Sequence, residues 1–222
     1  MNKNKPDINK GNIVEVVDAK YLRLYDYQYA PGRHYFNATR RHLDDLMVLK
    51  DENEFKEAIP DAVTIMVVIK TKDGEPKLLL AREYRYPAGQ FLISPPAGVL
   101  DPEDKLSDNP ILSAAKRELK EETGIILSKD DKLFIVNPLL FSTPGMTDES
   151  NAIACAVINL DDLSILSQNG AEDSELFDGF RLLTKSQAEN MIRNGRDEDG
   201  FFYSVFTQIV LNYFIYDRWM EE

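Results

Sequence analysis

The run from Ala62 to Lys70, AVTIMVVIK, constrains the fold of this chain more than any other stretch, because it is almost entirely apolar and rich in β-branched residues. A strand of this composition is buried on both faces of a sheet. The turn at 72–75 and the stretch Lys77–Glu83 indicate its partner in a hairpin. Further strands are expected at 91–93, 133–141 and 152–158, a loop at 94–108, and helices at 110–123, 184–194 and 201–220. Strands interleaved with helices predict an α/β layered domain around a mixed sheet.

The first 60 residues have a different pattern, which predicts a small antiparallel β segment. Strand patterns with turn signals between them lie at 13–17, 21–27 and 34–39. Residues 40–60 are charged and mixed, and we expect a connector with one short helix or strand. The sequence therefore predicts an N-terminal β-rich segment over residues 1–60 and a main domain over residues 61–222.

The charge of the chain argues against two classes of partner. Asp and Glu number 38 against 26 Lys and Arg, which gives a net charge of −12. Such a surface repels nucleic acid and anionic membranes, so neither is expected as a partner. The start of the chain has no apolar signal core, and no run approaches the roughly 20 apolar residues of a membrane span. The single cysteine, Cys155, permits no intrachain disulfide, and together these features predict a cytoplasmic protein.

The helix expected over Pro110–Thr123 has the clearest end signals. Asn109 suits the N-cap, Pro110 suits the first helical position, and Gly124 suits the left-handed position after the last turn. At about 100° per residue, the apolar residues form one buried stripe. Three glutamates occupy the adjoining arc: Glu118, Glu121 and Glu122.

Three clustered carboxylates near a helix C-terminus are unfavourable without a partner. On an open face each like-charged pair costs a few tenths of a kcal/mol (about 0.2–0.5), and burial of an unpaired carboxylate costs far more. A divalent cation would remove these penalties, and oxygen ligands are what magnesium prefers. The alternative is a solvated acidic face whose charges are offset by Lys116, Arg117 and Lys120. The helix alone leaves both interpretations open.

The segment from Arg117 to Ile125, RELKEETGI, resembles the second half of the Nudix box, Gx5Ex7REUxEExGU, and Gly98 resembles its opening glycine. Arg117 follows Gly98 by 19 residues, five more than the spacing of the box. The first glutamate of the box therefore falls on Asp104 when counted from Gly98, or on Asn109 when counted back from Arg117. Two further acids of this loop, Glu103 and Asp108, are also candidates for its role.

Two further segments resemble the ADP-ribose pyrophosphatase subgroup of this family. They are Ser142–Glu149, STPGMTDE, and the strand Arg82–Arg85, REYR. An N-terminal β segment is also typical of that subgroup, where it pairs two subunits. The resemblance therefore implies an α/β/α sandwich of the Nudix type, and a homodimer formed through residues 1–60.

The resemblance also implies a metal centre on the expected helix. Mg²⁺, or Mn²⁺ in its place, would be held by Glu118, Glu121, Glu122 and the backbone carbonyl of Ala97. Structural roles within the box would fall to Gly98, Arg117 and Gly124.

Substrate and base positions follow from the same resemblance. Arg85 would contact a phosphate or stack on the base, although a strand arginine paired with a neighbour is equally consistent with its position. Further substrate contacts would come from Pro144, Gly145 and Glu149. The general base would be Glu172 or Glu175 on the acidic loop Gly170–Glu175, with Glu149 as a further candidate; the alternative is that this loop is merely solvated.

The implied activity is magnesium-dependent hydrolysis of the pyrophosphate bond in a nucleoside diphosphate derivative, with ADP-ribose giving AMP and ribose 5-phosphate. Within the same enzyme class, the alternative is a nucleotide-sugar or other nucleoside-diphosphate pyrophosphatase. The alternative from another class is a non-catalytic Nudix domain that senses a nucleotide.

Overall fold

The computed structural model describes residues 5–72, 74–172 and 174–220 and divides into two compact units. The first unit comprises Met1–Ile59 and Phe141–Ser150, and the second comprises Pro60–Leu140 and Asn151–Glu222. Asp73 of the expected turn and Asp173 of the expected acidic loop lie outside the described residues.

A mixed sheet forms the centre of the second unit. Strand β4 (Ala62–Lys70) pairs antiparallel with β5 (Lys77–Arg85), as the predicted hairpin requires, and parallel with β9 (Ser150–Asn159). The strand order is β10-β5-β4-β9-β8. The remaining strands are β6 (Gln90–Ser94) beside β5, β7 (Ala97–Val99) beside β4, β8 (Lys132–Phe141) and β10 (Phe177–Leu183).

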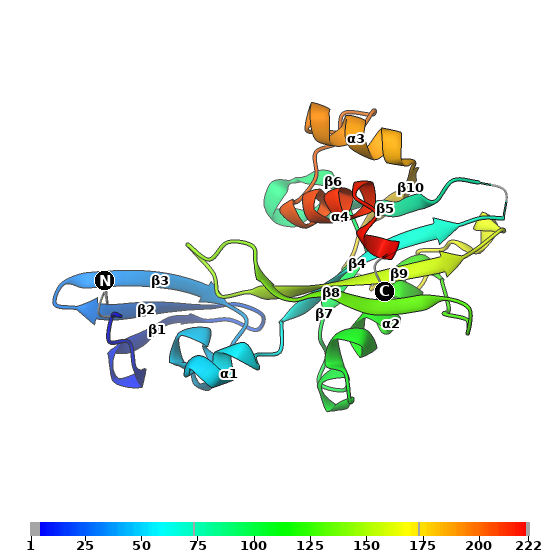
Figure 1. Cartoon of the computed structure of the whole chain (residues 1–222). Helices are drawn as coiled ribbons and strands as arrows, with labels where there is room; N and C mark the ends of the chain where they lie inside the picture. The colour runs from blue at the N-terminus through cyan, green and yellow to red at the C-terminus, as the bar shows by residue number, and fades with distance from the viewer. Residues whose placement is uncertain (1–4, 73, 173, 221–222) are drawn as a thin grey trace. The chain divides into compact units, whose positions relative to one another are not determined.

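Helices cover both faces of this sheet (Figure 1). Helix α2 (Pro110–Thr123) packs on one face against a core that includes Ile65 and Val67. Helices α3 (Lys185–Asn194) and α4 (Val205–Ile215) pack on the other, against a core that includes Met66 and Val68. Successive residues of β4 enter opposite cores, which explains why the run is apolar throughout. The predicted α/β/α arrangement is confirmed.

Three features of the main domain differ from the prediction. The stretch 94–108 is not all loop, because it contains β7 and a 3-10 turn at Asp104–Leu106. Strand β10 was not predicted, since Gly179 at φ 80° and a register shift between Phe177 and Phe180 interrupt its alternation. The last helix begins only at Val205, because the Ser204 side chain accepts the Thr207 N–H as an N-cap.

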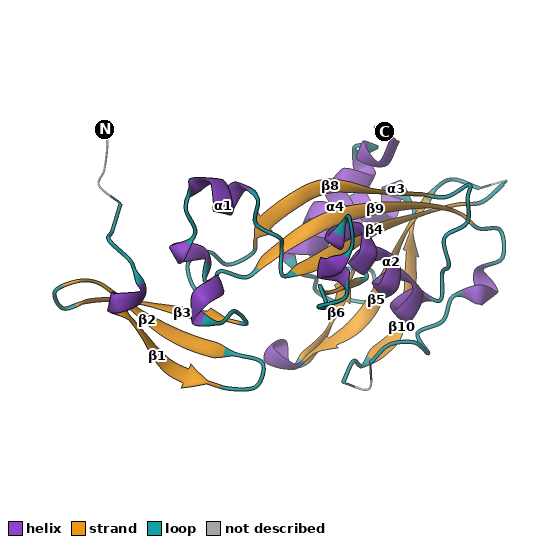
Figure 2. Cartoon of the chain, turned by 90° about the horizontal axis from the view of Figure 1, so that it is seen from below, coloured by secondary structure: helices purple, strands orange, loops and turns teal. Residues whose placement is uncertain are grey.

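The first unit contains the small antiparallel β segment that the sequence predicted (Figure 2). Its strands are β1 (Ile13–Asp18), β2 (Arg23–Ala30) and β3 (Arg33–Thr39), and its short helix α1 spans Glu52–Lys56. One face of the sheet covers a small core of Ile13, Tyr25, Tyr27 and Leu46. Across the described part of the chain, no helix combines the length and apolarity that a membrane crossing demands.

Candidate active site

Helix α2 carries the acidic cluster, and its observed ends match the prediction. The side-chain oxygen of Asn109 accepts the Leu112 N–H at 3.1 Å, and Gly124 adopts φ 74° after the last turn. The apolar stripe is buried, but so are Glu118, 7% exposed, and Glu122, 5% exposed. Glu121 is half-buried. The interpretation of a freely solvated acidic face is therefore wrong for two of the three glutamates.

The short strand β7 lies directly against this acidic face. A Cβ atom placed on Gly98 would fall 1.7 Å from Oε1 of Glu118, so only glycine leaves that carboxylate its position. The neighbouring Ala97 N–H donates to Oε2 of Glu122 at 3.2 Å. Gly98 thus does what its place in the predicted motif requires, because it lets the backbone approach the glutamates.

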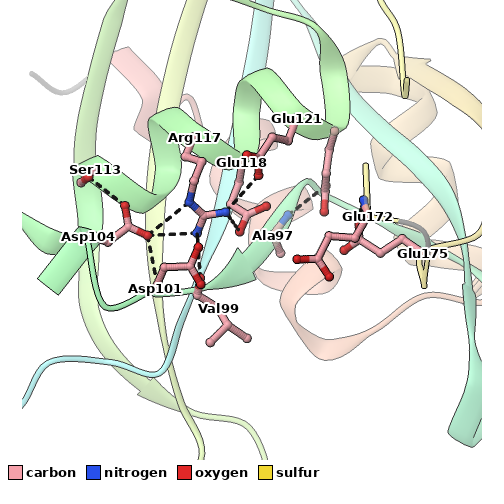
Figure 3. A network of polar contacts seen from close by, with 11 residues as sticks. Ala97, Val99, Asp101, Asp104, Ser113, Arg117, Glu118, Glu121, Glu172 and Glu175 are labelled. Carbon is pink, nitrogen blue, oxygen red and sulfur yellow. Dashed lines mark hydrogen bonds and ion pairs between the residues drawn. The ribbon is translucent and has the colours of Figure 1, made fainter. Parts of the chain in front are cut away.

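Arg117 organises the opposite side of the cluster (Figure 3). Its Nη1 donates to Glu118 at 2.7 Å and to Glu121 at 3.0 Å, and its Nη2 donates to the Val99 carbonyl at 2.9 Å. The same Nη2 reaches Oδ2 of Asp104 at 2.9 Å. One guanidinium therefore links two of the helix acids to the loop before the helix.

Asp104 occupies the place that the sequence left undecided between Asp104 and Asn109. It is 4% exposed and also accepts the Ser113 hydroxyl at 2.8 Å. Although burial alone would raise the pKa of Asp104, the hydrogen bonds from Ser113 and Arg117 outweigh burial and lower it. Asn109 serves as the helix cap, and the other two candidates, Glu103 and Asp108, are exposed.

The two buried glutamates are poorly compensated. Burial raises the pKa of Glu118 to about 7 even though Arg117 opposes the shift. Burial, together with the charges of Glu175, Glu118 and Glu83, raises the pKa of Glu122 to about 9, and the hydrogen bond from the Ala97 N–H opposes this shift. Among the described residues, no cationic side chain forms an ion pair with Glu122.

The acidic loop brings one of its two candidate bases to the cluster. Glu175 is half-buried, and its carboxylate accepts the Glu172 N–H at 3.0 Å, whereas the Glu172 side chain is exposed. Burial raises the pKa of Glu175, and its charge in turn raises the pKa of Glu118 and Glu122. The loop is tied to β5 by the bond from Tyr84 N–H to the Leu176 carbonyl, 2.8 Å.

Glu83 joins the same cluster from β5, and the sequence analysis assigned it no role. It is 9% exposed, burial raises its pKa, and its Oε2 lies 2.6 Å from Nη2 of Arg85. Arg85 therefore pairs with a strand neighbour. The signal in the sequence was the spacing of two residues, which places both side chains on one face of a strand.

The other predicted substrate residues belong to the first compact unit. The Gly145 carbonyl accepts the Tyr35 hydroxyl at 2.8 Å, and Glu149 pairs with Arg40 at 3.1 Å. Pro144 precedes Gly145 in the same β8–β9 connection. Their predicted contacts with substrate stay predictions.

The site suits a divalent cation by charge and donor type. The buried carboxylates outnumber the cationic groups around them, so a cation would be favoured here by charge. Carboxylate oxygens are also the ligands that magnesium prefers. In the arrangement described, no group of three or more Asp, Glu, His or Cys side chains converges closely enough to hold an ion. Glu118 and Glu121 instead share Arg117. To be held by three side chains of this cluster, an ion would therefore have to draw their carboxylates closer together.

Comparison with known proteins identifies the family. The family model of the NUDIX domain matches residues 60–202. The chain belongs to the Nudix family. Its members generally use divalent metal ions, which agrees with the donor set above.

Several Nudix proteins are similar to this chain. The ADP-ribose pyrophosphatase of Saccharomyces cerevisiae is 30% identical over 64% of this chain and 57% of its own length. An uncharacterized Nudix hydrolase of Schizosaccharomyces pombe is 31% identical over 61% of this chain and 62% of its own. The match thus spans about three fifths of each relative. The predicted resemblance to Nudix proteins of the ADP-ribose pyrophosphatase kind is confirmed.

A solved structure supports the fold over nearly the whole chain. The crystal structure of an ADP compounds hydrolase superposes with a TM-score of 0.58, covering 98% of this chain and 95% of that one at 18% identity. At this identity the likeness shows the fold, including the α/β arrangement that the sequence predicted.

Proposed function

We propose that this chain hydrolyses the pyrophosphate bond of a nucleoside diphosphate linked to a second group, with Mg²⁺, or Mn²⁺ in its place, as the cofactor. The observation that carries the proposal is a pair of buried glutamates on α2 that face strand β7 without enough positive charge around them: Glu118 lies against Gly98, and Glu122 accepts the Ala97 N–H. Such a pair is costly in an empty site and favourable around a dication that also binds phosphate oxygens.

The metal ligands would be Glu118, Glu121 and Glu122, with the backbone carbonyl of Ala97 as a further donor. When bound, the ion would neutralise charge on the diphosphate and supply Lewis acidity. Arg117 orients Glu118 and Glu121 by charge-assisted hydrogen bonds, and Asp104 holds Arg117.

Glu175 is the general base that we favour over Glu172. Its carboxylate is half-buried and its charge acts on both buried glutamates, whereas Glu172 offers its N–H to Glu175 and exposes its own side chain. Burial raises the pKa of Glu175, which makes its carboxylate a stronger proton acceptor.

ADP-ribose is the substrate that we propose, with AMP and ribose 5-phosphate as products. The support is the similarity to the yeast ADP-ribose pyrophosphatase, together with the sequence segments Ser142–Glu149 and Arg82–Arg85. Nucleotide sugars and other nucleoside diphosphate derivatives present the same diphosphate to the site, so they remain the alternative substrates.

Product analysis on a substrate panel tests this proposal. Purified protein with Mg²⁺ should convert ADP-ribose to AMP and ribose 5-phosphate faster than it converts nucleotide sugars, and Glu122→Gln should lose at least about 100-fold in turnover. Glu103→Gln, an exposed acid in the same loop region, is the control and should keep full activity. A protein that binds ADP-ribose but cuts no member of the panel would instead be the nucleotide-sensing alternative.

We further propose a cytoplasmic homodimer that forms through the N-terminal segment. The face of the three-stranded sheet opposite its core exposes Val14, Val17 and Phe36, each about half accessible. A second copy of the chain would cover this face. Light scattering should report a dimer for the full chain and a monomer for a chain that lacks residues 1–60. If the shortened chain were still a dimer, the interface would not lie in this segment.

A further inference from the structure

Glu83 is a buried carboxylate for which the proposed reaction has no use. Its side chain is only 11% exposed, and it lies on the face of β5 that also carries Leu79, which packs in the core under α2. Alternate residues of a strand share a face, so Glu83 and Arg85 both point to the side of the sheet that holds the acidic cluster. A carboxylate in this place adds repulsion to an already acidic site unless it does something else.

Arg85 is the group that Glu83 holds. Nη2 of Arg85 lies 2.6 Å from Oε2 of Glu83, and the arginine side chain is 44% exposed. A free arginine of this exposure would move among many rotamers, each with its head group in a different place. A short hydrogen bond between two charged groups is about twice as strong as a neutral one, so it restricts the positions that the guanidinium can take.

The pair lies close enough to both α2 and the acidic loop to act on their carboxylates. The charge of Glu83 acts on Glu122 of α2, and the charge of Arg85 acts on Glu175 of the acidic loop. Glu83 contacts Nη2 of the Arg85 guanidinium. Because a guanidinium has five N–H donors, the other donors are left for an incoming anion. Within this cluster, Arg117 is already engaged with four oxygen-bearing groups, so Arg85 is the cation with donors to spare.

We propose that Glu83 is a positioning residue that aims Arg85 at the diphosphate of the substrate. The inference rests on the proposed function, and it assigns Glu83 to binding of the substrate through Arg85 and not to the metal. Loss of the carboxylate should therefore weaken substrate binding much more than it slows the chemical step.

A double-mutant cycle tests this assignment. The variants are Glu83→Gln, Arg85→Ala and both together, assayed for KM and kcat on ADP-ribose with Mg²⁺. Calorimetric titration with the non-hydrolysable analogue α,β-methylene ADP-ribose gives a binding constant that does not depend on turnover. Glu83→Gln should raise KM and the analogue Kd about tenfold while kcat stays within about threefold. The double variant should be no worse than Arg85→Ala, because Glu83 acts through Arg85.

The same strand offers a matched control. Asp178 pairs with Arg82 of β5 at 3.2 Å, on the opposite face of the sheet from Glu83. Asp178→Asn also converts the carboxylate partner of a β5 arginine to an amide, and it should leave KM and the analogue Kd unchanged. An equal effect in this control would mean that the strand as a whole was disturbed, which would overturn the positioning role.

Three other results would overturn it. The first is an unchanged Kd in Glu83→Gln. The second is additive effects of the two substitutions, which would mean that Glu83 and Arg85 act independently. The third is a fall in kcat with a higher magnesium requirement, which would make Glu83 a metal ligand. A chain that binds the analogue but does not cut ADP-ribose would refute the proposed activity, while the analogue Kd values would still decide the role of Glu83.

Discussion

Asp104 accepts two hydrogen bonds from the guanidinium of Arg117, one from Nη2 at 2.9 Å and one from Nε at 3.3 Å. The pairing persists although the loop between Gly98 and Arg117 is five residues longer than the Nudix spacing. The 3-10 turn Asp104–Leu106 absorbs part of the added length and leaves Asp104 buried under the helix. A shorter acid on a longer loop thus anchors the arginine that orients Glu118 and Glu121.

Asp104→Ala should therefore damage both stability and activity. It removes a buried acceptor of three side-chain donor atoms. The guanidinium of Arg117 is then left with Glu118, Glu121, the Val99 carbonyl and the longer ion pair to Asp101. We expect a loss of about 2 kcal/mol in the free energy of unfolding and a fall of about 10–100-fold in kcat. Denaturant unfolding and steady-state kinetics measure the two effects.

Asn109→Ser is the matched control for that substitution. Serine keeps a capping oxygen at the start of α2, so stability and kcat should both stay close to those of the unsubstituted chain. If Asp104→Ala were harmless and Asn109→Ser lowered kcat, then the residue that supports Arg117 in solution would be Asn109.

The buried glutamates predict an unusual pH dependence for the metal-free protein. The pKa values of Glu118 and Glu122 are about 7 and about 9 in the folded chain, against 4.5 for an unperturbed glutamate. At a pH between 4.5 and the raised pKa of each glutamate, the folded state holds a proton that the unfolded state has released. The free energy of unfolding should therefore fall as pH rises from about 5 to about 9, by at most about 1.4 kcal/mol per pH unit for each group.

Urea unfolding in a chelating buffer at a series of pH values measures this slope. In Glu122→Gln the decline between pH 7 and 9 should largely disappear, because the group that releases its proton there is gone. Mg²⁺ should stabilise the unsubstituted chain more at pH 8.5 than at pH 6, since it competes with those protons. A metal-free stability that is flat or rises over this range would contradict the burial of uncompensated acids.

The local signals in the sequence were sufficient for the helix that carries the site. Asn109, Pro110 and Gly124 fix the ends of α2 through short-range chemistry, and the apolar run of β4 fixes the layer on which the helix packs. Both depend on neighbours within a few residues, so a single sequence is enough to predict them.

The parts that were missed depend on contacts between distant segments. Whether Asp104 or Asn109 supports Arg117 is decided by how the longer loop folds back, and spacing along the chain carries no such information. Strand β10 is held by its pairing with β5, despite a weak pattern of its own. Glu83 becomes significant only when the sheet places it beside Glu122 and Glu175.

Gly98→Ala should inactivate the chain with little effect on its expression or secondary structure. The added methyl group would overlap the Glu118 carboxylate, which would have to rotate away from its place between Arg117 and β7. Turnover should fall by about 100-fold or more, while circular dichroism stays unchanged. Gly89→Ala serves as the control, because a Cβ there meets nothing within 4 Å although φ is 62°. Near-normal turnover in Gly98→Ala would mean that Glu118 does not need this position.

Glu175 and Glu172 are three residues apart, yet their substitution should have very different consequences. Glu175 is half-buried and acts electrostatically on Glu118, Glu122 and Glu83, whereas the Glu172 side chain is exposed. Glu175→Gln should lower kcat by about 100–10,000-fold with KM changed little, as loss of a general base does. The kcat of Glu172→Gln should stay within about threefold of that of the unsubstituted chain, because the backbone N–H of residue 172 still donates to the Glu175 carboxylate.

The pH profile of kcat distinguishes a base from a residue that only shapes the loop. With Glu175 present, kcat should fall at low pH as the base becomes protonated, and this limb should vanish in Glu175→Gln, where the residual rate no longer depends on that proton. A structural role would lower the rate and leave the limb in place. If both substitutions are harmless, the base lies outside the acidic loop, and Glu149 becomes the next candidate.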